Sequence, residues 1–122
     1  MNLKDLAEAW TIMWGISYII TALVAPSISD TPAILYGWLG ALILFMVLMM
    51  HLAYDKVGYR IVAIVFFALG IMMTYGGVVS WTGAGLWNVP FPNKDLFQVS
   101  MAFVDMLSAV FLFLLGIEMA RK

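Results

Sequence analysis

Four segments of this chain are long and apolar enough to cross a membrane as helices. They lie at about residues 8–26, 32–54, 58–81 and 95–119. A helix rises about 1.5 Å per residue, so roughly 20 apolar residues are needed to cross the hydrocarbon layer. Hydrophobic residues make up 65% of the chain and charged residues only 11%, a composition outside the range of soluble domains. We therefore expect an all-α fold, a four-helix transmembrane bundle that forms a single integral membrane domain over residues 1–122.

The rest of the composition excludes several functions. The chain has no cysteine, which rules out disulfides, thiolate metal sites and cysteine nucleophiles. Its formal net charge is −1 and no run of basic residues occurs, so neither nucleic acid nor anionic lipid is an expected partner. The first apolar segment lacks a basic leader and a small-residue cleavage signature, and we interpret it as a retained helix.

The basic residues predict the orientation in the cell membrane. With four spans, only Lys94 of the six basic residues falls on one side. The positive-inside rule then places both termini and the second connection in the cytoplasm. The five basic residues on the cytoplasmic side are Lys4, Lys56, Arg60, Arg121 and Lys122.

Two helix starts have recognisable capping signals. Asp5 followed by Glu8 resembles a capping box at the start of the first helix. Asp55, with Gly58 nearby, indicates a tight helical hairpin between the second and third segments.

Asp105 lies near the middle of the last apolar segment. A charged side chain at that depth costs roughly 2.5–3.5 kcal/mol on insertion scales, so it should face protein or water instead of lipid. Small and polar residues lie before and after Asp105 at helical spacing and predict the packing face of this helix. That face consists of Gln98, Ala102, Asp105, Ser108, Ala109 and Gly116, with Phe111, Leu112, Phe113 and Leu114 expected opposite.

Hydroxyl groups on other helices are the expected partners of Asp105. Counting from the helix ends puts Tyr18, Thr21, Thr74 and Tyr75 at a similar depth. The alternative is a proton relay or cation site, but a relay usually needs a chain of ionisable groups and here there is one. Small residues also recur four apart at Ser17 and Thr21 and at Gly37 and Ala41, which favours further close helix contacts.

One methionine-rich stretch offers weak metal-ligand candidates. Met46, Met50 and His51 place soft sulfur atoms beside an imidazole, a set that can hold copper(I). Methionine is also an ordinary filler of helix contacts, and ten are spread along the chain, so packing is the favoured interpretation. We assign no metal, cofactor or catalytic residue to this chain.

The connection between residues 81 and 94 is the one long loop. Its aromatic residues Trp81, Trp87 and Phe91 should lie at the membrane interface or against another chain, because irregular backbone is not left in lipid. An interfacial loop that touches only lipid is the alternative. We favour a loop that binds a partner subunit.

The length, four spans, lack of cysteine, methionine-rich segments and the loop around Trp81, Trp87 and Pro90 together resemble a known family. They are similar to the small accessory membrane subunit of archaeal ammonia monooxygenase. The resemblance implies a copper-dependent complex that oxidises ammonia to hydroxylamine, with its copper bound by larger partner subunits.

The leading functional hypothesis is therefore a non-catalytic accessory subunit of a hetero-oligomeric membrane oxidoreductase. Other integral membrane subunits and the lipid bilayer are its expected partners. Two alternatives remain. One is a small oligomeric proton-coupled transporter that uses Asp105, although no inverted repeat is evident. The other is an accessory protein that holds copper at Met46, Met50 and His51.

Overall fold

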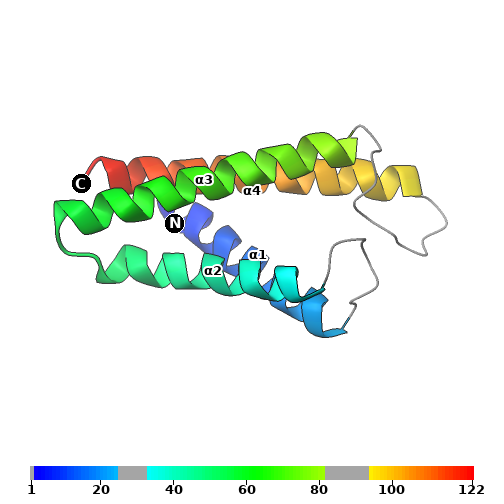
Figure 1. The fold of residues 1–122 in the computed structure, drawn as a ribbon. Coiled ribbons are helices and arrows are strands. Elements are labelled where there is room, and N and C mark those ends of the chain that lie inside the picture. Colours follow the sequence, from blue (N-terminus) through cyan, green and yellow to red (C-terminus); the bar gives the residue numbers. More distant parts are fainter. Residues whose placement is uncertain (1, 25–32, 82–93) are drawn as a thin grey trace.

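The computed structural model describes residues 2–24, 33–81 and 94–122, which form four α-helices (Figure 1). Helix α1 spans Leu3–Val24, α2 spans Ala33–Leu52, α3 spans Lys56–Trp81 and α4 spans Lys94–Ala120. Each helix is long and apolar enough to cross a membrane, and no strand occurs within the described ranges. The predicted all-α fold with four membrane-spanning helices is confirmed.

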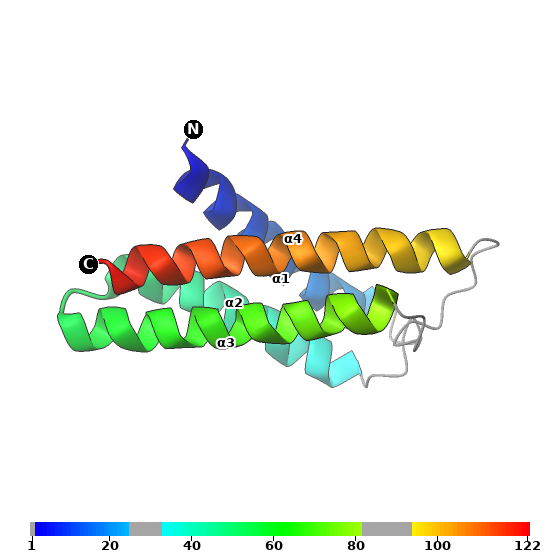
Figure 2. The same cartoon turned by 90° about the horizontal axis from the view of Figure 1, so that it is seen from above.

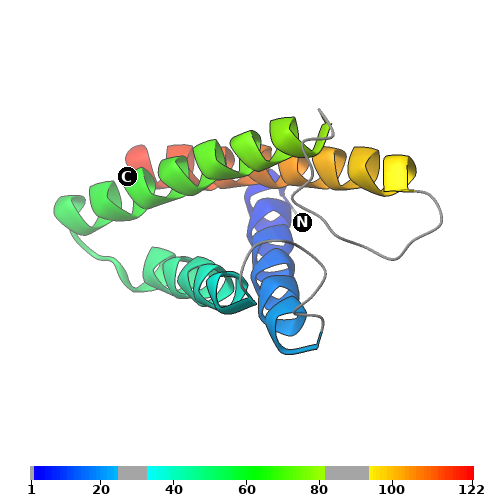
Figure 3. The same cartoon turned by 45° about the vertical axis from the view of Figure 1, so that its right-hand side comes forward.

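The helices form two hairpins that are joined along one seam. Helix α1 packs mainly against α2, and α3 packs mainly against α4, while the hairpins meet through α1 and α4. Helices α2 and α3 make only minor contact. Figures 1 and 2 show α3 and α4 side by side, and Figure 3 shows α1 crossing them steeply. The bundle is therefore open between α2 and α3.

The caps at two helix starts explain where these helices begin. Asn2 Oδ1 accepts a hydrogen bond of 2.9 Å from the backbone N–H of Asp5, so the predicted capping box at Asp5 and Glu8 is wrong. Asparagine is one of the best N-cap residues, and it starts the helix at Leu3, before the apolar segment. Asp55 Oδ1 accepts a hydrogen bond of 2.7 Å from Gly58 N–H, so Asp55 separates α2 from α3 as predicted. The tight hairpin expected between these two helices is wrong, because α2 and α3 make only minor contact.

Glycines permit the close approach of helices within each hairpin. A methyl group on Gly40 of α2 would lie 2.5 Å from the backbone oxygen of Gly15 on α1. In the other hairpin, a methyl group on Gly70 would lie 2.7 Å from the ring of Phe113. Distances below 3.0 Å are not tolerated without a shift, so these glycines set the spacing of the helices.

Helix α4 buries more of its surface than the sequence pattern predicts. Ala102, Asp105, Ser108, Ala109 and Gly116 are buried, as the packing face requires. Phe111 and Leu112, expected on the opposite face, are buried too, because α4 contacts both α1 and α3. The exposed face follows a different stripe at helical spacing, namely Phe103, Met106, Val110 and Ile117.

Candidate functional site around Asp105

Asp105 is enclosed by three helices of its own chain. Its side chain is only 3% exposed, and its Oδ1 has no hydrogen-bond partner among the described residues. Gly76 of α3 lies beside it, since a methyl group there would be 3.6 Å from Asp105 Oδ2. Tyr18 of α1 is close enough for a direct electrostatic interaction with this carboxyl group. The predicted shelter for Asp105 is therefore present within this single chain.

The predicted hydroxyl partners of Asp105 form other contacts. The Tyr18 hydroxyl donates to Met73 Sδ at 3.4 Å. The Thr74 and Thr21 hydroxyls donate to backbone oxygens of their own helices, at 2.9 Å to Gly70 and 2.8 Å to Ser17. Tyr75 is 69% exposed and points away from the core. The prediction of a hydroxyl partner for Asp105 Oδ1 is therefore wrong.

One turn further along α4, Ser108 connects the two hairpins. Its Oγ accepts a hydrogen bond of 2.8 Å from Trp10 Nε1 of α1 and donates to the backbone oxygen of Val104. The Trp10 ring also packs against Phe111, with centroids 5.6 Å apart. We call the contact formed by Trp10, Ser108 and Phe111 the α1–α4 seam. Sequence reasoning placed Ser108 on the packing face but missed Trp10 as its donor.

A small cavity lies on α1 beside the seam. It has a volume of about 120 Å³ and is lined by Trp10, Met13, Trp14, Ser17 and Val104. The buried Nε1 of Trp14 has no hydrogen-bond partner among the described residues. The same indole packs edge-on against Tyr18 at 5.1 Å. Among the described residues, neither the Trp14 Nε1–H nor Asp105 Oδ1 makes a well-formed hydrogen bond, although the Trp14 indole approaches the Tyr18 hydroxyl.

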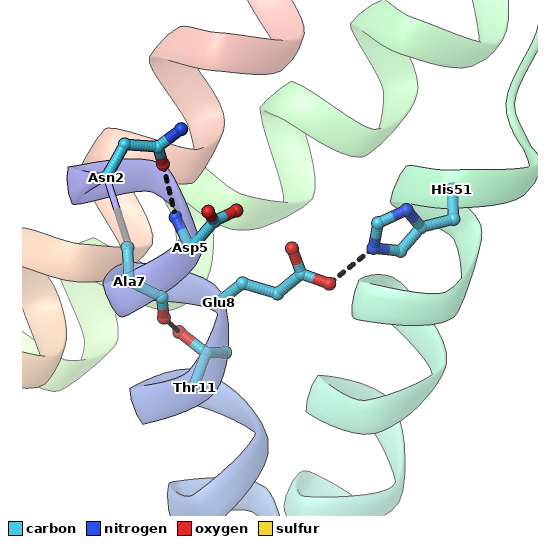
Figure 4. Close-up of polar contacts among 6 residues, drawn as sticks. All are labelled: Asn2, Asp5, Ala7, Glu8, Thr11 and His51. Carbon is cyan, nitrogen blue, oxygen red and sulfur yellow. Dashed lines mark hydrogen bonds and ion pairs between the residues drawn. The ribbon is translucent and has the colours of Figure 1, made fainter.

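The methionine-rich stretch of α2 separates its side chains. Met46 and Met50 are buried in the apolar core, whereas the His51 ring is exposed. His51 Nε2 contacts Glu8 Oε1 of α1, and Figure 4 shows the two side chains pointing toward each other. This contact was missed because Glu8 and His51 are 43 residues apart in sequence. They come together only when the α1–α2 hairpin forms.

The acidic and histidine side chains of the described residues come together at most in pairs. Within residues 2–24, 33–81 and 94–122, no three His, Cys, Asp or Glu side chains come together in a group that could hold a metal ion. Met46 and Met50 lie in the buried apolar core whereas His51 is exposed, so these three candidate copper ligands do not share one environment.

Some of the predicted residues lie outside the described part of the structure. These are Trp87 and Phe91 of the proposed partner loop, together with the side chains of Trp81 and Gln98.

Comparisons with protein-family models, curated proteins and solved structures found no match to this chain. The arguments for its function therefore come from its own residues, from the geometry of the helices and from the resemblance described above.

Proposed function

We propose that this chain is a non-catalytic accessory subunit of a hetero-oligomeric membrane oxidoreductase. The choice of an ammonia monooxygenase as the parent complex follows from the resemblance in length, spans and loop pattern. In that complex, copper belongs to the partner subunits, and this chain contributes helix surfaces.

The observation that carries the proposal is the use of polar and small residues for helix contacts. Trp10 and Ser108 connect the hairpins, Gly40 brings α2 against α1, and Gly70 accommodates Phe113. Within the described ranges, these groups do not converge on a reactive cluster with a nucleophile, a base and an orienting group. Polar and small residues placed in this way pack helices against one another.

The open bundle also provides surfaces for further helices. Apolar side chains are exposed on α2 and α3, the two helices that barely contact each other. Lipid can cover such faces, but small and aromatic residues also let transmembrane helices of other subunits pack closely. The exposed side chains on α2 are Leu35, Trp38, Leu42, Phe45 and Leu48, and those on α3 include Ile61, Ile64, Ile71, Tyr75 and Val78.

Replacement of Asp105 by Leu tests the proposal. In the isolated chain, the carboxyl oxygen Oδ1 is buried without a partner, so its removal should leave the free energy of unfolding unchanged or raised. Because Oδ1 is buried inside the bundle, a partner subunit reaches it only if α1 shifts on assembly, and we expect that shift and a hydrogen bond from the partner to Oδ1 in the complex. Asp105→Leu should therefore reduce the fraction of assembled complex, measured by co-purification, while turnover per assembled complex is kept.

Asp105→Asn is the matched control, because it removes the charge and keeps an acceptor oxygen. It should assemble as the unaltered chain does. Normal assembly of Asp105→Leu would contradict the proposed role of this side chain.

A second candidate function is a proton-coupled transporter, and the unpartnered Oδ1 of Asp105 is the observation that favours it. Intramembrane carboxyl groups mark proton relays in pumps and transporters. Purified protein in liposomes should then show a pH-driven flux that Asp105→Asn abolishes. The accessory role instead predicts that the unaltered chain and this variant give the same background flux.

A further inference from the structure

The fold collects basic residues that are dispersed in the sequence. Lys56 and Arg60 lie in the first turns of α3, and Arg121 and Lys122 follow the end of α4. Figures 1 and 2 show the end of α4 beside the start of α3. The four cations therefore lie at one end of the α3–α4 hairpin, although no basic run occurs in the chain.

A cation–π contact fixes part of this cluster. Lys122 Nζ lies over the ring of Tyr59, 5.5 Å from its centroid. Tyr59 is three residues after Lys56, and Arg60 is four residues after it, so the three side chains share one side of α3. We call Lys56, Arg60 and Lys122, with Tyr59 between them, the basic patch.

Acidic residues only partly neutralise the patch. Asp55 accepts the hydrogen bond from Gly58 N–H at the start of α3, and Glu118 lies 3.9 Å from Arg121. Within the described part of the chain, neither Lys56 nor Arg60 has a carboxylate within ion-pair distance. Together with Arg121, the three cations of the patch and these two acidic side chains leave a local side-chain charge of +2 at this end of the hairpin.

The position of the patch indicates what kind of anion it binds. Helix α3 exposes Val57 in its first turn and Ile61 and Ile64 in the turns that follow, and these apolar side chains belong in acyl chains. A ligand with a phosphate at the patch and hydrocarbon along these residues satisfies both surfaces. Basic side chains directly beside a membrane span attract anionic headgroups.

We propose that the basic patch and the exposed apolar face of α3 next to it bind the phosphate headgroup of an anionic phospholipid. Lys56 and Arg60 contact the phosphate, and Tyr59 holds Lys122 beside it.

Native mass spectrometry of the purified full chain in a neutral detergent tests this assignment. Phosphatidylglycerol and phosphatidylcholine with the same acyl chains are titrated separately. Phosphatidylglycerol should bind more tightly, and Lys56→Gln or Arg60→Gln should weaken its binding about fivefold each. Lys56→Arg should retain it, because the charge is kept.

Lys4→Gln is the matched control. It removes one positive charge, and Lys4 lies in the first turn of α1, outside the α3–α4 hairpin that carries the patch. Equal affinity for the two lipids, or an equal loss in Lys4→Gln, would overturn the proposal. Competition by soluble glycerol phosphate at the same concentrations as the lipid would also overturn it, because the site would then take a free phosphate anion.

Discussion

At the residue scale, Asp105 and Ser108 occupy one packing face but differ in how their polar atoms are satisfied. Ser108 accepts from Trp10 and donates to its own helix, whereas Asp105 Oδ1 has no partner among the described residues. Ser108 therefore holds the α1–α4 seam together in this chain. Asp105 keeps an acceptor that the chain itself does not use.

Replacement of Ser108 by Ala tests the seam. The change leaves the half-buried Trp10 Nε1–H without its acceptor and should lower the free energy of unfolding in mixed micelles by about 1 kcal/mol. A double-mutant cycle with Trp10→Phe isolates the hydrogen bond, and we expect a coupling of about 0.6 kcal/mol. Additive effects of the two substitutions would show that Trp10 and Ser108 do not interact.

The sequence predicts the burial of Asp105 because an acid in the middle of an apolar segment has few other options. It does not predict the hydrogen-bond partners of Asp105. Counting depth from helix ends assumes nearly parallel helices, and α1 crosses α4 steeply (Figure 3). Tyr18 does come close to Asp105, but its hydroxyl donates to Met73. Side-chain rotamers and helix crossing angles determine these hydrogen-bond partners, and a hydropathy pattern contains information on neither.

At the element scale, each hairpin is built around glycines. The sequence indicated a close contact at Gly37 and Ala41, but the tightest approach in the α1–α2 hairpin is at Gly40. Helix α2 is apolar nearly all round, so its sequence does not define which side faces α1. The rotation of α2 about its axis follows from the packing of both helices.

Replacement of Gly40 by Ala tests this contact. The added methyl group would lie 2.5 Å from the backbone oxygen of Gly15, which cannot rotate away. We expect the free energy of unfolding to fall by about 1–3 kcal/mol. Gly37→Ala is the matched control, because its methyl group would meet Ala22 Cβ at an ordinary 3.6 Å. A loss of stability as large in Gly37→Ala as in Gly40→Ala would argue against the geometry of this hairpin.

At the scale of the whole molecule, four apolar segments define four helices, and the basic residues predict their orientation. The chain has no cysteine, so single introduced cysteines report sidedness without background labelling. With both termini in the cytoplasm, Lys4→Cys and Tyr54→Cys should react with an impermeant thiol reagent only after the membrane is opened. Asn88→Cys, in a loop beyond the described residues, should react in intact cells. The reverse labelling pattern would show that both termini lie outside the cytoplasm.

The arrangement of the two hairpins could not be predicted from segment lengths. Sequence patterns identify apolar helices, but the contact between hairpins depends on Trp10, which lies 98 residues before its hydrogen-bond partner Ser108, and on the packing of Trp10 against Phe111. The convergence of Lys56, Arg60 and Lys122 has the same origin, because it appears only when α3 and α4 pair. Long-range pairing therefore creates both the seam and the basic patch.

The mass of the native particle tests the proposed accessory role most directly. The protein is extracted gently from the cells that make it, and the intact particle is weighed and its components identified by mass spectrometry. We predict a particle much larger than the 13.6 kDa chain, in which this chain is bound to other integral membrane subunits. A stable, monodisperse 13.6 kDa monomer, or an assembly of this chain alone, would contradict the account.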